Sequence, residues 1–224
     1  MKCAVKGLAL LATLFSATVV LANPVKEFSA DSVDAKSGRL EGKVYVTSTK
    51  MRFEDYASGE KPEFISLIRF DQQKMYFLFT DSKTYIEYPL EVKSPSDWKE
   101  MQKVLGGLAE MPGIEMKTTE KKVAEETVNG YKTEKFRITE TATFMGTRQT
   151  STSYVWIAKE FSIPIRTQDD EDDGKITELR NIKIGAPPAS LFELPAGYKL
   201  DKEKMGQIEE MRNAMDAMRQ APTR

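Results

Sequence analysis

The chain has 224 residues, with 33 Lys and Arg against 34 Asp and Glu, and therefore a formal net charge of −1 at pH 7. A chain this close to neutral lacks the basic excess of a nucleic-acid interface, so nucleic acid is not expected among its partners. It has no histidine and one cysteine, Cys3, which argues against imidazole metal ligands, disulfides and any Ser–His–Asp or Cys–His catalytic arrangement.

The first 22 residues have the pattern of a secretory signal peptide. Lys2 and Lys6 supply positive charge before and at the start of an apolar run over residues 7–21, and the small Ala22 precedes Asn23. The alternative, an uncleaved membrane anchor, would need about 20 apolar residues to cross a bilayer, and this run is shorter. We therefore expect cleavage after Ala22 and a soluble periplasmic chain with no integral membrane segment.

Residues 27–90 alternate apolar and polar side chains, which is the pattern of antiparallel strands with one buried face. Met75, Phe77 and Phe79, for example, fall on one face of a single strand. Short polar breaks between the apolar runs are typical of hairpin connections. This region predicts a meander of short strands, as in a barrel or sandwich.

Residues 94–111 interrupt the strand pattern. Ser94 can cap a helix, and Trp98, Met101 and Leu105 then recur at helical spacing. The segment predicts one amphipathic helix in the middle of a β protein, placed across the sheet.

The strand pattern resumes at Ile114. Asn129-Gly130 is a strong signal for a two-residue hairpin turn, because both residues tolerate positive φ. Trp156 has apolar neighbours on both sides in the sequence, so its strand is expected to be covered on both faces.

An acidic run follows at residues 169–174, Asp-Asp-Glu-Asp-Asp-Gly. Its oxygens could bind a hard cation, but the run lacks the spaced ligands of an EF-hand loop. A solvated hairpin turn closed by Asp-Gly is the favoured interpretation.

The last predicted element is a helix over Lys202–Gln220. Its apolar stripe consists of Met205, Ile208, Met211, Met215 and Met218. This stripe could pack onto the protein's own barrel or a second copy, or it could dock an envelope protein partner, since methionine side chains adapt to varied apolar surfaces.

The sequence offers no enzyme motif. The pattern SxxK occurs at residues 96–99, but the SDN and KTG elements that accompany it in serine acyl enzymes are absent. We therefore expect a protein that is not an enzyme and that needs no cofactor or metal.

Three parts of the chain resemble the LolA-like family of periplasmic lipoprotein carriers: residues 42–54, residues 68–90, and residues 155–168 together with 179–200. The second segment is similar in particular to the DUF4412-type relatives, which are outer-membrane lipoprotein-sorting-like proteins. The resemblance implies a mainly β fold with two or three helices, an open antiparallel β-barrel with a helical lid. Phe192 and Leu194 would then hold the final crossing segment against the barrel rim.

The resemblance also implies a division of the chain. Residues 1–22 would be the signal peptide, residues 23–200 the barrel domain with its lid helix at about 94–111, and residues 201–224 a Met-rich amphipathic helix and tail. Two features depart from the carriers of this family. The chain enters a strand pattern soon after Ala22 without a preceding amphipathic helix, and the arginine-proline pair expected after the second strand is replaced by residues 47–49.

The function that the resemblance implies is non-enzymatic binding or carriage of a lipid, an acyl chain or a lipoprotein. The candidate ligand contacts are the large apolar residues of the expected cavity and lid. They are Phe64, Phe70, Met75, Phe77, Phe79, Trp98, Met101, Leu105, Phe136 and Trp156. The alternative is that these residues fill a dry core, and that the protein is an envelope interaction or assembly module on the same scaffold.

Overall fold

The computed structural model describes residues 26–56, 59–90, 92, 114–144, 147–161, 163–170 and 174–220. The expected signal peptide, the expected lid helix with Trp98, Met101 and Leu105, and the middle of the acidic run lie outside the described residues. Within the described part, neither helix combines the length and the apolar character needed to cross a membrane.

All strands of the described part belong to one sheet, in the order β12-β6-β5-β4-β3-β2-β1-β11-β10-β9-β8-β7. In chain order they are β1 (Phe28–Asp34), β2 (Leu40–Val46), β3 (Lys50–Asp55), β4 (Phe64–Arg69), β5 (Lys74–Phe79), β6 (Thr84–Pro89), β7 (Ile114–Val128), β8 (Tyr131–Phe144), β9 (Thr147–Ala158), β10 (Arg166–Asp169), β11 (Ile176–Ile184) and β12 (Lys199–Leu200). Neighbouring strands are antiparallel except for β12, which pairs in parallel with β6.

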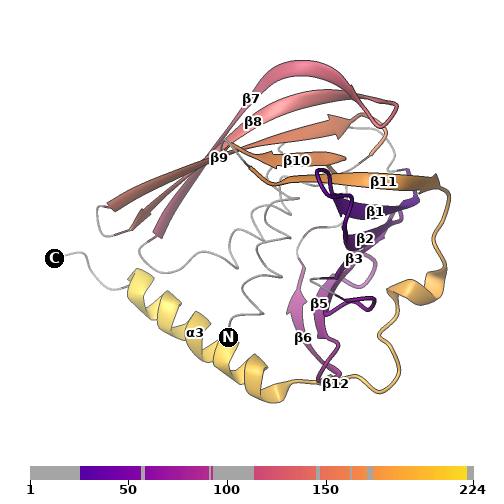
Figure 1. The fold of residues 1–224 in the computed structure, drawn as a ribbon. Coiled ribbons are helices and arrows are strands. Elements are labelled where there is room, and N and C mark those ends of the chain that lie inside the picture. Colours follow the sequence, from indigo (N-terminus) through magenta and orange to yellow (C-terminus); the bar gives the residue numbers. More distant parts are fainter. Residues whose placement is uncertain are drawn as a thin grey trace.

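The sheet curls into an open trough (Figure 1), with the long strands β7–β9 arching over one side and β2–β6 forming the other. Helix α3 (Lys202–Gln220) runs along the open side, and a 3-10 helix, η1 (Ala189–Phe192), lies outside the curl. The predicted mainly β fold with an open antiparallel sheet is confirmed, as are the bounds predicted for the last helix.

The strand register aligns apolar residues across the concave face. Val46 of β2 is opposite Met51 of β3, and Met51 is opposite Ile68 of β4. Ile68 in turn is opposite Met75 of β5. Paired residues point to the same face of a sheet, so these four side chains form a continuous row. They belong to the largest of the buried apolar clusters, called here the principal core cluster.

Strands β4 and β5 are buried on both faces, because both of their alternating sets of residues are mostly apolar. On the outer face Leu67 and Leu78 are fully buried in a second cluster. Phe192 of η1 packs into the same cluster and is 1% exposed. The outer cluster therefore depends on a segment that follows β11 in the chain.

The hairpin predicted at Asn129-Gly130 is confirmed. These two residues connect β7 to β8 and have φ values of 51° and 85°. Positive φ at both central positions is the requirement of a type I′ turn, whose twist matches that of the flanking strands.

The strap, residues 185–198, carries the chain from β11 around the outer face to β12. Two arginines on adjacent strands hold it: Arg52 of β3 donates to the carbonyl oxygen of Leu191 at 2.9 Å, and Arg69 of β4 donates to that of Phe192 at 2.8 Å. Phe192 packs the strap against the sheet as expected, whereas Leu194 lies past η1 and is 36% exposed.

Replacing the anchor of the strap should destabilise the fold. We expect Phe192→Ala to lower the free energy of unfolding by about 3 kcal/mol, because it leaves a cavity between β4 and β5 and the strap. Leu194→Ala is the matched control, with an expected loss below about 1 kcal/mol. Urea denaturation followed by circular dichroism measures both, and equal losses would contradict the assigned role of Phe192.

The arginine that holds the strap is itself held by a carboxylate. Arg69 donates from Nε and Nη2 to the two carboxylate oxygens of Asp71, both at 2.8 Å. This pairing lowers the pKa of Asp71 below its ordinary value of 3.8. A carboxyl with a lowered pKa in the folded state stabilises the fold above its unfolded pKa, and that contribution disappears as the pH falls through the lowered value.

We therefore expect Asp71→Asn to be less stable than the wild type at neutral pH. The difference in unfolding free energy should shrink as the pH falls from 3.8 through the lowered pKa, because the wild-type carboxyl is protonated first in the unfolded chain and then in the folded one. Urea denaturation over a series of acidic pH values tests this. A difference that stays constant across the series would show that the Asp71 charge does not support Arg69.

Candidate ligand-binding site

Aromatic side chains follow one another along the concave face from β4 to β6. The ring of Phe64 lies 5.7 Å from that of Phe77 and 5.5 Å from that of Phe79. The ring of Phe77 is also 5.7 Å from that of Tyr88, which leads the series to the edge of β6. Offset and edge-to-face contacts of this kind stabilise a rigid apolar surface.

Helix α3 covers this end of the concave face. Its Met205 and Ile208 side chains pack against the principal core cluster and are themselves partly buried. The first turn is capped by Asp201, whose carboxylate accepts from the backbone N–H of Lys204 at 3.0 Å. Since Asp201 directly follows β12, the pairing of β12 with β6 fixes where the helix begins.

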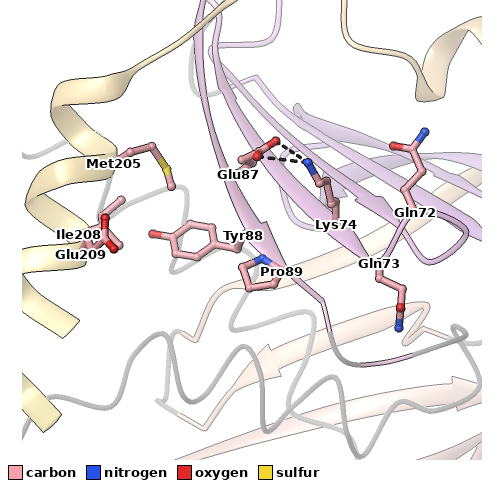
Figure 2. Close-up of a pocket in the computed structure, with 9 residues that line it drawn as sticks. All are labelled: Gln72, Gln73, Lys74, Glu87, Tyr88, Pro89, Met205, Ile208 and Glu209. Atoms are coloured by element: carbon pink, nitrogen blue, oxygen red, sulfur yellow. Dashed lines mark hydrogen bonds and ion pairs between the residues drawn. The ribbon is translucent and has the colours of Figure 1, made fainter. Parts of the chain in front are cut away.

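A pocket of about 320 Å3 lies between α3 and the ends of β5 and β6 (Figure 2). Figure 2 shows Met205 and Ile208 of the helix facing Tyr88, beside Pro89, while polar side chains form the other side. The lining residues are Gln72, Gln73, Lys74, Glu87, Tyr88, Pro89, Met205, Ile208 and Glu209. Its wall is therefore apolar toward the helix and polar toward the β5–β6 edge.

An ion pair lies at the outer rim of the pocket, because Lys74 and Glu87 alternate with Met75 and Tyr88 and therefore point to the outer face of the sheet. The Lys74 ammonium is 3.2 Å from both carboxylate oxygens of Glu87. This hydrogen bonding raises the pKa of Lys74, so its side chain stays protonated. A second cation lies at the start of α3, where Lys204 is 4.5 Å from the ring centroid of Phe79.

The structure brings most of the described candidate residues together. Phe70, Met75, Phe77 and Trp156 belong to the principal core cluster and are at most 3% exposed, while Phe64 and Phe79 are partly buried against it. The first four are already covered by the chain itself. Trp98, Met101 and Leu105 lie outside the described residues.

Phe136 is not brought together with the other candidates. It belongs to a separate cluster with Ile138, Val155 and Ile157. The register explains this, because Phe136 is opposite Val155, whereas Trp156 is opposite Lys135, and adjacent residues of a strand point to opposite faces.

The ring of Trp156 is buried and contacts two cationic side chains. Lys135 lies 4.4 Å and Arg166 5.4 Å from its ring centroid, and its indole N–H donates to Glu126 at 2.9 Å. A ring held in this way is a fixed part of the core, and it is not presented to the pocket at the edge of β6.

Tyr88 and the Lys74–Glu87 pair are the site residues that the sequence did not reveal. Tyr88 is opposite Met75, so its place on the concave face follows from the period of two within β6. That period could have identified it as a partner of Phe77. The ion pair could not be found in this way, because it depends on the register between β5 and β6.

Metal binding has no support within the described residues, where no three Asp, Glu or Cys side chains come close enough together to hold an ion. The acidic run is only partly described, so the turn expected there remains a prediction.

The model of a family described as "Domain of unknown function (DUF4412)" matches residues 32–163. No curated protein matches the chain in sequence. An uncharacterized conserved protein from Thermus thermophilus aligns over 87% of this chain and 98% of its own, with 12% identity and a TM-score of 0.48. The lipoprotein LppX of Mycobacterium tuberculosis aligns over 79% of this chain and 93% of its own, with 14% identity and a TM-score of 0.31. These likenesses are too remote to transfer a ligand or a partner.

The helix contact can be broken by a single charge. We expect Ile208→Asp to release α3 from the sheet, and amide hydrogen exchange over residues 202–220 should accelerate by about tenfold or more. Gln207→Asp places the same residue at an exposed position of the same helix and should change exchange much less. Mass spectrometry of peptides from this helix measures both, and equal rates in the two variants would contradict a packed helix.

Proposed function

The chain belongs to the DUF4412 family, and from the site described above we propose that it is a non-enzymatic binding or carrier protein for a lipid, an acyl chain or a lipoprotein. The observation that carries the proposal is the pocket at the edge of β6, where the aromatic series of the concave face meets the apolar side of α3. The apolar side of this pocket, toward the helix, fits an unbranched hydrocarbon chain.

Binding would be passive. Each Å2 of apolar surface removed from water contributes about 25 cal/mol, so burial of a hydrocarbon chain supplies affinity without covalent chemistry. The pocket between Tyr88 and Met205 would receive one end of the chain, and outward movement of α3 would lengthen the channel along Phe77 and Phe79. The contacts of Met205 and Ile208 with the sheet would then be replaced by contacts with the ligand.

The polar rim outside the apolar channel would orient the ligand. Lys74 and Glu87 neutralise one another at 3.2 Å, so this side presents hydrogen-bonding groups without a strong net charge. A polar head group would lie here, at the solvent boundary, with its hydrocarbon chain directed toward the aromatic series.

We also propose the compartment and the division of the chain that the sequence indicates. The pattern of residues 1–22 supports export to the periplasm through a cleaved signal peptide. Residues 23–200 would form the binding domain and residues 201–224 its covering helix and tail. Docking of an envelope protein partner would use the part of this helix beyond Ile208.

The test is ligand uptake by delipidated protein. We expect native mass spectrometry to show one palmitate or phospholipid molecule bound per chain. Tyr88→Ala should weaken palmitate binding about tenfold, because losing roughly 60 Å2 of apolar contact at about 25 cal/mol per Å2 removes about 1.5 kcal/mol.

The matched control is Tyr85→Ala, which truncates a tyrosine of the same strand that packs against the outer cluster. It should leave palmitate affinity unchanged. The proposal fails if the delipidated wild type takes up neither fatty acid nor phospholipid, or if both tyrosine variants lose affinity equally.

One observation favours a second function, an interaction or assembly module with a filled barrel. Four candidate residues, Phe70, Met75, Phe77 and Trp156, are buried by the chain itself. If the core is filled in this way, affinity purification from the periplasm should recover an envelope protein whose binding is lost on truncation after Leu200, while palmitate uptake is absent from the intact chain.

A further inference from the structure

Strand β7 forms one end of the sheet. In the described part of the chain its only neighbour is β8, which leaves the other edge of this long strand without a strand partner. Its described side chains from Lys117 to Thr127 are all exposed or half-buried, and Val123 is 45% exposed. An edge of this length presents a row of backbone donors and acceptors that another strand can use.

The charges of β7 are arranged symmetrically. Residues 121–126 read Lys-Lys-Val-Ala-Glu-Glu, and a β-bulge falls at Val123, because Lys122 is opposite Phe136 and Ala124 is opposite Lys135. The bulged residue has no partner of its own in the ladder. The remaining residues place two lysines before Ala124 and two glutamates after it.

We propose that β7 pairs antiparallel with β7 of a second copy of this chain, about a two-fold axis at Ala124. In this register Lys122 lies opposite Glu125 of the partner subunit, and Lys121 lies opposite Glu126 of the partner subunit. The symmetry repeats each pair, so four opposite-charge pairs form around two facing alanines.

The charges also select this register. A two-fold axis at Lys121, Lys122 or Glu125 would place that residue opposite its own copy, with like charges facing each other. Like charges that face each other oppose the pairing of an edge strand with a second copy. The reversed order of signs in β7 removes this repulsion in the register centred on Ala124.

The ion pairs already present on β7 do not prevent it from pairing with a second copy. The Lys122 ammonium is 2.6 Å from Glu125 and from Glu134. Glu125 is 72% exposed, Lys122 42% and Glu134 22%. Exposed ion pairs contribute little to stability, so they can rearrange when a second strand supplies backbone hydrogen bonds. Glu126 keeps one oxygen on the Trp156 indole, and its other oxygen, 3.7 Å from the Lys135 ammonium, can also approach a lysine of the second copy.

This interface would leave the ligand pocket accessible. β7 is at one end of the strand order, and β6, which forms the pocket with α3, is near the other. The inference is therefore independent of the proposed function, and either can fail without the other.

The experiment uses charge reversal of one pair, Lys122 and Glu125, in the full chain. Analytical ultracentrifugation should show a concentration-dependent dimer for the wild type. Lys122→Glu and Glu125→Lys, each alone, should raise the dissociation constant by about tenfold or more, since each places two like-charge pairs at the interface.

Two further measurements should restore the dimer. An equimolar mixture of the two single variants should form a heterodimer, and the double variant Lys122→Glu/Glu125→Lys should again form a homodimer. Lys183→Glu makes the same charge change at an exposed position of β11 and should not affect the dissociation constant. Circular dichroism confirms that each variant is folded.

A wild type that stays monomeric at the highest attainable concentration overturns the inference. So does a dimer that both single variants form as well as the wild type, or a mixture that forms no heterodimer.

Discussion

The arrangement of this protein depends on the two arginine hydrogen bonds that fix the strap to the outer face of the sheet. Arg52 and Arg69 lie on neighbouring strands and donate to the carbonyl oxygens of consecutive residues, Leu191 and Phe192. Both guanidinium groups are largely buried and are paired with carboxylates, so their removal would leave unpaired groups in the interior. The strap leads directly to β12 and α3. The arginines on the outer face of the sheet therefore hold the segment that places α3 over the concave face.

Burial of β4 and β5 on both faces connects the stability of the fold with the proposed binding surface. Their outward residues pack with Phe192, and their inward residues carry the aromatic series that ends at Tyr88. A ligand in the pocket would therefore contact strands whose positions are already fixed by packing on the outer face. Preorganisation of this kind lowers the entropic cost of binding, because few side chains must be ordered when the ligand arrives.

Much of the fold could be predicted from local patterns. The period of two in Met75, Phe77 and Phe79 identified an inward face, and the Asn129-Gly130 turn and the bounds of the last helix followed from residue type and spacing. The placement of Phe136 could not be predicted, because it depends on which residue of β9 it faces. The same holds for the pocket, since the meeting of Tyr88 and Met205 is a long-range contact with no local signal.

The parallel pairing of β12 with β6 has a consequence for the order of folding. Lys199 is opposite Thr84, so α3 reaches its place only after β6 has formed and the strap has passed around the outer face. Contacts between distant parts of a chain form late, because closing the intervening loop costs entropy before the contact is made. A chain that emerges N-terminus first therefore completes its concave face before Met205 and Ile208 arrive to cover it. The interval between these two events is when a hydrocarbon chain would meet the least resistance to entry.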